Sequence, residues 1–200
     1  MLIVIFAWIS GFVIPDLFGL SELIMMAKYG IIKGHLYTLC FTNMIRFLAI
    51  VIIFLLIKTS PVILYNVKQF DFLPLIILIL VAILISIILI PRQGIKIITE
   101  INFYHNKTGA FWPLFISNRY LLHILQITTI SIMVMILNRT INPIFSGIVA
   151  GSLWAVIDLV MRNFRFAIYN ILLSVVISIS YSQFGNFSLP LLIGMIPQII

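Results

Sequence analysis

The chain has 200 residues, of which 63% are hydrophobic and 8% charged, with a net charge of +7 and a mean hydropathy of +1.26. Soluble domains carry about 45–50% apolar and about 25% charged residues, so this chain has too few polar side chains to cover a soluble fold. The composition excludes an ordinary cytoplasmic enzyme and a disordered chain, and the single cysteine, Cys40, excludes a disulfide-stapled secreted domain. We therefore expect an all-α fold, a polytopic bundle of transmembrane helices.

Apolar stretches long enough to approach a membrane crossing recur along the whole chain. A bilayer core of about 30 Å needs about 20 helical residues per crossing. Such stretches occupy 1–20, 36–57, 72–91, 111–137, 143–161, 166–182 and 187–200. Because Pro15 and Asp16 interrupt the first stretch and the last one is short, we expect six to seven membrane helices in a single membrane domain, 1–200. The fourth stretch is too long for one straight crossing, and Pro113 near its start predicts an interfacial turn.

Basic residues concentrate in alternate connections between these stretches. The connections 21–35, 92–110 and 162–165 hold seven Lys or Arg residues, whereas the other connections hold three. Because cytoplasmic loops are enriched in Lys and Arg, this bias predicts an N-terminus outside and a C-terminus in the cytoplasm. We expect a multi-pass protein of a cell membrane, and a bacterial one. Segment 92–110, which follows the N-terminal helices of 1–91, mixes apolar and charged residues and predicts an amphipathic helix at the interface. We expect membrane lipid as a partner and no nucleic acid, since no face combines basic and aromatic residues.

Five ionisable residues lie inside apolar stretches, where a charge is costly and is a functional-site hypothesis by default. They are Asp16, Arg46, Arg119, His123 and Asp158. Asp16 lies near a helix end, where its carboxylate can reach the interface. We expect Arg46 to pair with a carboxylate or with backbone carbonyls. His123 lies one turn beyond Arg119, and we expect it to be a hydrogen-bonded packing residue.

Arg119 and Asp158 are the most informative of these residues. In the predicted orientation Arg119 lies early in the fourth stretch and Asp158 late in the fifth, so both lie near the cytoplasmic leaflet. Because an unpaired charge at that depth is strongly unfavourable, we expect an intramembrane ion pair between them. The pair would be either purely structural or part of a working polar site.

The sequence lacks the usual patterns of metal and hydrolytic chemistry. The three histidines, His35, His105 and His123, have no His or Glu three or four positions later. There is no HExxH motif, no glycine-rich phosphate loop and no buried serine with a suitably spaced base. We therefore expect no metal and no cofactor, and we favour a protein that is not an enzyme while leaving that question open.

Three segments of the C-terminal part carry a further pattern: FWPLFISNRYLL, LWAVID and FGNFSLPLLIGMIPQII. They resemble the CPBP family of membrane proteins, which includes CAAX prenyl endoproteases and the Abi or bacteriocin self-immunity proteins. That family has an EExxxR motif, a later FxxxH and a final HxxxN or HxxxD. Arg119 matches the arginine of the first motif, while Leu114 and Phe115 stand in place of its two glutamates.

The two later motifs are degenerate as well. Trp154 takes the aromatic position and Asp158 the histidine position of the second motif, while Gly194 and Gln198 fall at the His and Asn/Asp positions of the third. In the family, Glu and His side chains are taken to activate water for peptide cleavage. The resemblance therefore implies a CPBP-like core at 111–200 that has kept the fold and lost the protease, a pseudoenzyme.

Three functions stay open from the sequence. The first is a non-catalytic CPBP-like protein that binds a membrane protein or peptide, in self-immunity, regulation or scaffolding. Its former active-site cavity would be apolar, lined by Leu114, Phe115, Trp154 and Gly194. The second is a small transporter or channel subunit whose intramembrane charges line a polar path. The third is an intramembrane protease with substituted active-site residues, Asp158 among them.

Overall fold

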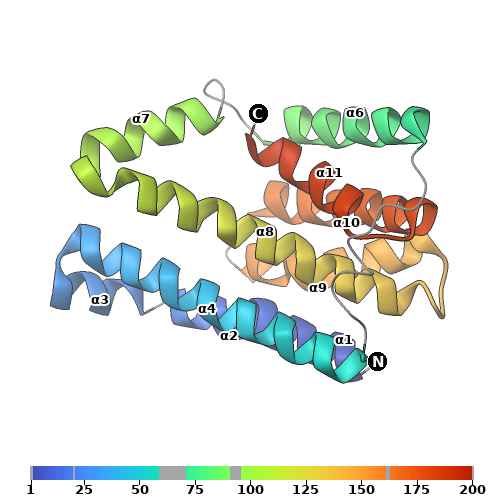
Figure 1. The fold of residues 1–200 in the computed structure, drawn as a ribbon, viewed down its shortest axis with the longest axis horizontal. Coiled ribbons are helices and arrows are strands. Elements are labelled where there is room, and N and C mark those ends of the chain that lie inside the picture. Colours follow the sequence, from blue (N-terminus) through green and yellow to red (C-terminus); the bar gives the residue numbers. More distant parts are fainter. Residues whose placement is uncertain (1, 20, 59–70, 91–95, 161–162, 200) are drawn as a thin grey trace.

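The computed structural model describes residues 2–19, 21–58, 71–90, 96–160 and 163–199 (Figure 1). Within these ranges the chain forms helices joined by turns and contains no strand, which confirms the predicted all-α class. The elements are α1 (Leu2–Trp8), η1 (Ile9–Val13), α2 (Ile14–Gly19), α3 (Glu22–Tyr29), α4 (Ile31–Ile57), α6 (Phe72–Leu89), α7 (Lys96–Thr108), η2 (Gly109–Phe111), α8 (Trp112–Leu137), α9 (Pro143–Val160), α10 (Phe164–Phe184) and α11 (Ser188–Ile199).

Four helical segments in the described part of the chain are long and apolar enough to cross a membrane: Ile31–Ile57, Phe72–Leu89, Ile101–Leu137 and Phe164–Phe184. A fifth candidate is the bent pair Leu2–Phe18 and Glu22–Tyr29, with 43° between its two parts, while the apolar helix Pro143–Val156 is shorter. The last helix, α11, has 12 residues and rises by about 18 Å, which is less than a bilayer core. The helices therefore indicate a membrane-embedded protein with four or five long spans.

Large apolar side chains cover the outside of these helices. On α6, Leu80, Leu84 and Ile88 follow one another at four-residue spacing and are 59%, 56% and 69% exposed. Water around such a stripe would be unfavourable because apolar area is costly to hydrate. The stripe fits contact with lipid tails.

The helices run roughly lengthwise between two ends of the bundle (Figure 1). α3, the start of α4 and the turn from α7 into α8 lie together at one end, and the N-terminus lies at the other. The connection 21–35 and the turn from α7 into α8, which belongs to the predicted connection 92–110, thus share one end of the bundle (Figure 1). Residues 92–95, which belong to the second connection, lie outside the described part of the chain.

The amphipathic segment continues directly into the fourth apolar stretch. Its described part is α7, after which the turn η2 leads into α8 with Pro113 in the first helical turn. Proline is tolerated there because the first backbone N–H groups of a helix have no intrahelical acceptor. A turn is therefore present near this proline, and its position at the membrane interface stays a prediction.

Two glycines one turn apart let α9 approach α10 closely. A Cβ atom added at Gly147 would lie 2.4 Å from the Cα of Val175, and one at Gly151 would lie 2.6 Å from the Cα of Ile171. This is the small-xxx-small spacing by which membrane helices bring their backbones together. The close approach fixes the rotation of α9 against α10, and so determines which side chains of the two helices face the same cavity.

Candidate functional site: a polar cavity among the helices

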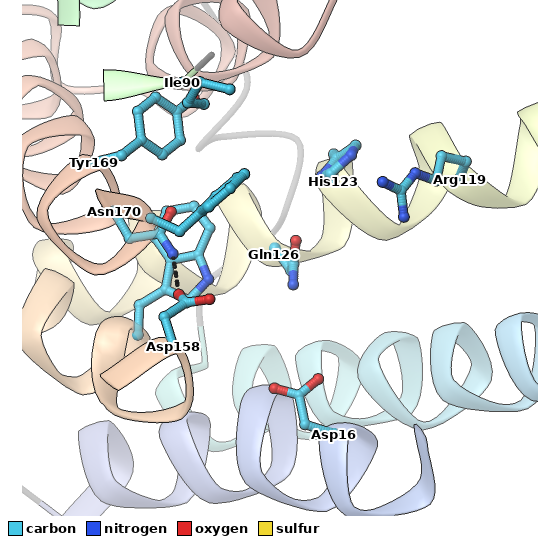
Figure 2. Close-up of a pocket in the computed structure, with 10 residues that line it drawn as sticks. Asp16, Ile90, Arg119, His123, Gln126, Asp158, Tyr169 and Asn170 are labelled. Carbon is cyan, nitrogen blue, oxygen red and sulfur yellow. Dashed lines mark hydrogen bonds between the residues drawn. The ribbon is translucent and has the colours of Figure 1, made fainter. Parts of the chain in front are cut away.

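A cavity of about 360 Å³ lies among α2, α8, α9 and α10, with Ile90 after α6 closing one side (Figure 2). α8 supplies Arg119, His123 and Gln126 to its wall. These residues are four and three positions apart, a spacing that aligns them on one face of a helix. The volume is close to the lower end of the range of about 300–1,000 Å³ typical of small-molecule sites, so the cavity suits a small molecule, a side chain or a chain end.

The opposite wall combines an acid with an amide and aromatic rings. Asp158 lies one turn after Trp154 on α9, and the adjacent wall of α10 carries Phe166, Tyr169 and Asn170. The side-chain N–H of Asn170 donates to Oδ2 of Asp158 over 2.7 Å (Figure 2). This hydrogen bond holds the carboxylate in place, and no side chain among the described residues is hydrogen-bonded to its second oxygen.

The cavity lies at the level where three of the shorter helices end. Ile90 directly follows α6, Asp158 is in the last turn of α9, and Phe166 is in the first turn of α10. Helix ends in membrane proteins mark the passage from the hydrocarbon core to the interface. The cavity therefore lies toward the α9–α10 connection, where these helices end.

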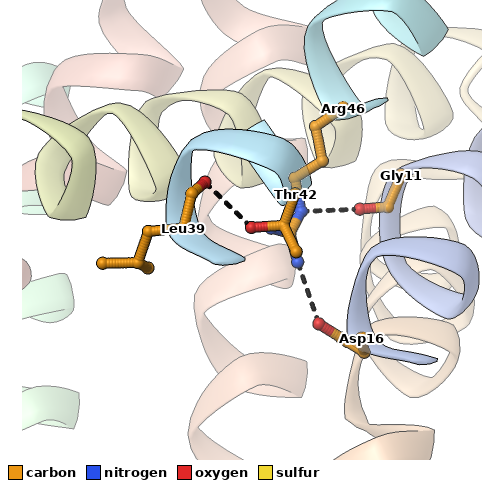
Figure 3. A network of polar contacts seen from close by, with 5 residues as sticks. All are labelled: Gly11, Asp16, Leu39, Thr42 and Arg46. Carbon is orange, nitrogen blue, oxygen red and sulfur yellow. Dashed lines mark hydrogen bonds and ion pairs between the residues drawn. The ribbon is translucent and has the colours of Figure 1, made fainter. Parts of the chain in front are cut away.

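A second acid, Asp16, reaches the cavity from the broken first helix. Pro15 has no backbone N–H, so the Gly11 carbonyl lacks its usual α-helical donor, and the segment before the proline has π-helical geometry. Arg46 of α4 donates through Nε to the Gly11 oxygen and through Nη2 to Oδ1 of Asp16, each over 2.9 Å (Figure 3). Both kinds of partner expected for Arg46 are thus present at a side chain only 2% exposed.

The structure brings Arg119 and Asp158 to one cavity, but on opposite walls. Arg119 and His123 lie along α8, while Asp158 lies beside Asn170 across the cavity (Figure 2). The carboxylate of Asp158 takes Asn170 as its hydrogen-bond partner, and among the described residues no Lys or Arg nitrogen pairs with it. The two charges expected to form an ion pair therefore flank a space instead.

The other motif positions are dispersed. Leu114 is 51% exposed, and a Cβ added at Gly194 would touch the side chain of Ile127 at 3.0 Å. Gln198 lies in α11, and its side chain is outside the described part of the chain. Of the four residues expected to line an apolar cavity, only Trp154 lines the polar cavity.

Phe115 belongs to a second, smaller groove of about 220 Å³ at the end of the bundle. There its ring stacks between His35 of α4 and Tyr104 of α7, with centroid distances of 5.5 and 5.1 Å. Nδ1 of His35 also lies 2.5 Å from Oε1 of Glu22. Since α8 extends beyond the ends of α6, α9 and α10, residues one turn before Arg119 meet α4 and α7 and not the cavity.

Sequence reasoning missed the uncharged members of the site. Gln126, Asn170, Phe166 and Tyr169 line the cavity, yet a search for intramembrane ionisable groups passes over them. A helical reading of α8 would have found Gln126, which shares a face with Arg119. The residues of α10 gave no comparable signal.

The cavity offers fixed charges, amides and aromatic rings. Within the described residues no group of three or more His, Cys, Asp or Glu side chains could hold a metal ion. His105, the third histidine, lies on α7 with its ring 6.2 Å from that of Trp112, away from the cavity. No family model, no curated protein and no solved structure matches the chain.

Proposed function

We propose that the protein is a non-catalytic, multi-pass protein of a bacterial cell membrane that binds a membrane protein or peptide. The partner would insert one charged group into the polar cavity. The observation that carries this proposal is that Arg119 and Asp158 face one cavity from opposite walls within a bundle of membrane-length helices. Charged residues in such bundles are costly and mark ligand or ion sites.

The proposed topology has six to seven crossings, with α9 and the bent first helix counted among them. The N-terminus would lie outside and the C-terminus in the cytoplasm, so that the cavity opens near the cytoplasmic surface. A CPBP-like core at 111–200 stays a prediction from the sequence pattern, and the positions of Leu114 and Gly194 away from the cavity lend it no support.

Recognition fits the acids of the cavity better than hydrolysis does. A pair of carboxylates that share a proton must be free to meet, as in aspartic proteases. Asp16 gives one oxygen to Arg46, and Asp158 is hydrogen-bonded to Asn170 from another wall. Fixed opposite charges instead orient a ligand and select it by electrostatic complementarity.

Site-specific photocrosslinking in native membranes tests the proposal. A benzophenone amino acid would replace Phe166, a cavity-lining residue that is 37% exposed, and the matched control would replace Ile168, which is 48% exposed on the same helix. We expect a discrete protein or peptide adduct from position 166 only, and its loss in Arg119→Gln and Asp158→Asn variants. The same adducts from both positions, insensitive to these variants, would overturn the proposal.

A second candidate function, a small transporter subunit, is favoured by the broken first helix. Transporters place unwound or interrupted helices at their substrate sites, and Asp16 lies just after such an interruption on the cavity wall. Flux of a radiolabelled organic cation or zwitterion into liposomes containing the purified chain would support transport. A flux no greater than that of empty liposomes would leave binding as the function.

A further inference from the structure

We propose that the group held in the cavity is an organic ammonium, bound by the Asp158 carboxylate against the aromatic rings of Trp154, Phe166 and Tyr169. The inference rests on the proposed function, because it names the chemistry of the group that the same cavity receives. It is supported by the charge of one wall, by the aromatic rings that line the same cavity, and by the opposite charge on the facing wall.

The acid wall carries a carboxylate to which the described residues supply no cationic partner. Asp16 is neutralised by Arg46, whereas Asp158 accepts a neutral amide hydrogen bond from Asn170, and no Lys or Arg nitrogen among the described residues lies within salt-bridge distance of it. A partly buried carboxylate in a membrane bundle is stabilised by a bound cation. Asp158 is therefore the natural binding point for a positively charged group.

The surroundings of Asp158 favour an organic cation over a metal ion. Trp154 and Tyr169, only 8% and 1% exposed, line the cavity together with Phe166. Aromatic faces attract an ammonium group within about 6 Å of the ring centroid, and they are the usual walls of sites for methylated ammonium ligands. A metal ion would need several further oxygen or nitrogen ligands, and the described residues contain no such cluster.

The facing wall repels a cation and accepts an anion. Arg119 and His123 lie there on α8, across the cavity from Asp158 (Figure 2). An ammonium group is thereby confined to the α9–α10 side, while an anionic group attached to it would be drawn to Arg119. The matching ligand class is an ammonium compound, above all a zwitterion with its positive end at Asp158.

Binding of choline to the full chain in nanodiscs of phosphatidylglycerol tests this inference, with 3,3-dimethylbutanol as the uncharged isostere. We expect isothermal titration to show at least tenfold tighter binding of choline than of the isostere. Asp158→Asn, which can still accept the hydrogen bond of Asn170, should weaken choline binding at least tenfold. Ser152→Ala, at an exposed position of α9, is the matched control and should leave it unchanged.

Variants of Trp154 test the contribution of the aromatic ring to choline binding separately from that of the Asp158 carboxylate. Trp154→Leu should weaken choline binding at least fivefold, and Trp154→Phe should retain most of it because a ring face remains. Size-exclusion profiles identical to that of the wild type would show that these variants are folded. Equal affinity for choline and its isostere, or choline binding that is indifferent to both Asp158→Asn and Trp154→Leu, would overturn the inference.

Two further experiments distinguish a peptide from a lipid as the source of the ammonium group. A peptide with a free N-terminus should compete with choline where its N-acetylated form does not, if a peptide supplies the group. If a lipid supplies it, nanodiscs that contain phosphatidylethanolamine should suppress choline binding. The second result would keep the ammonium inference and remove the proposed peptide partner. A crosslinked peptide adduct at position 166 without ammonium selectivity would keep the proposed function and remove the inference.

Discussion

The Arg46 side chain provides hydrogen bonds to two polar groups of the first helix, the Gly11 carbonyl and the Asp16 carboxylate. The proline leaves the Gly11 carbonyl without an α-helical donor, and Asp16 puts a charge next to it. The guanidinium has several N–H groups in a fixed plane, so it can donate to both groups at once. The same contact aims Asp16 at the cavity wall and joins α4 to the first helix.

Replacing Arg46 by Met should therefore destabilise the protein. Breaking a fully buried ion pair costs about 3–5 kcal/mol, and we expect at least about 2 kcal/mol here because the Asp16 side chain is 34% exposed. Arg46→Lys should be intermediate, since one ammonium group replaces a planar fork. Reversible unfolding in detergent measures the free energy of each variant.

The double variant Arg46→Met with Asp16→Asn is the control for that experiment. It removes the uncompensated carboxylate, so it should recover part of the lost stability, although the Gly11 carbonyl still lacks its donor. An Arg46→Met variant as stable as the wild type would contradict the structural role of the pair.

The shape of the cavity depends on how α9 packs against α10. Gly147 and Gly151 allow the two backbones to meet, and the polar residues of both helices then share one side. Trp8 of α1 adds a tether, because its indole N–H donates to the Leu153 carbonyl over 2.7 Å. The hydrogen bond links the first helix to α9.

Gly151→Leu should separate the two helices. A Cβ there would meet backbone atoms of Ile171, which cannot move aside as a flexible side chain can. Overpacking costs about 1–3 kcal/mol, and we expect the upper part of that range with loss of choline binding. Ser152→Leu makes a large change on the exposed side of the same helix, and it should alter neither thermal stability in detergent nor binding. Equal behaviour of the two variants would show that the glycine is not a packing position.

At the scale of the whole molecule, hydrophobic stretches predicted the helices and their embedding in a membrane. The rotation of each helix about its axis determines which side chains line the cavity. Apolar stretches identify helices from local sequence, and the partners of Arg46 were predicted correctly because a buried guanidinium must have them. The cavity could not be predicted in the same way. It joins Asp16, Gln126, Asp158 and Asn170, whose faces are set by contacts between helices distant in the sequence.

Helix lengths explain the remaining differences between expectation and structure. The predicted apolar cavity assumed that Phe115 and Arg119 meet the same neighbours because they are one turn apart. α8 extends beyond the ends of the shorter helices. Phe115, one turn before Arg119, therefore contacts His35 and Tyr104. Motif spacing alone carries no information on where neighbouring helices end.

We propose that a charged, water-accessible cavity opens near the cytoplasmic surface of a membrane bundle. Cysteine labelling tests it most directly, because Cys40 is the single native cysteine and Cys40→Ser supplies a blank background. Gln126→Cys would report on the cavity wall, and Leu125→Cys, at a neighbouring position only 5% exposed, would serve as the control.

We predict that a membrane-impermeant cationic thiol reagent labels position 126 in inverted membrane vesicles and that choline slows the reaction. Right-side-out vesicles and the Leu125→Cys control should stay unlabelled. Absence of labelling at position 126 from either face, with the protein folded, would contradict the account.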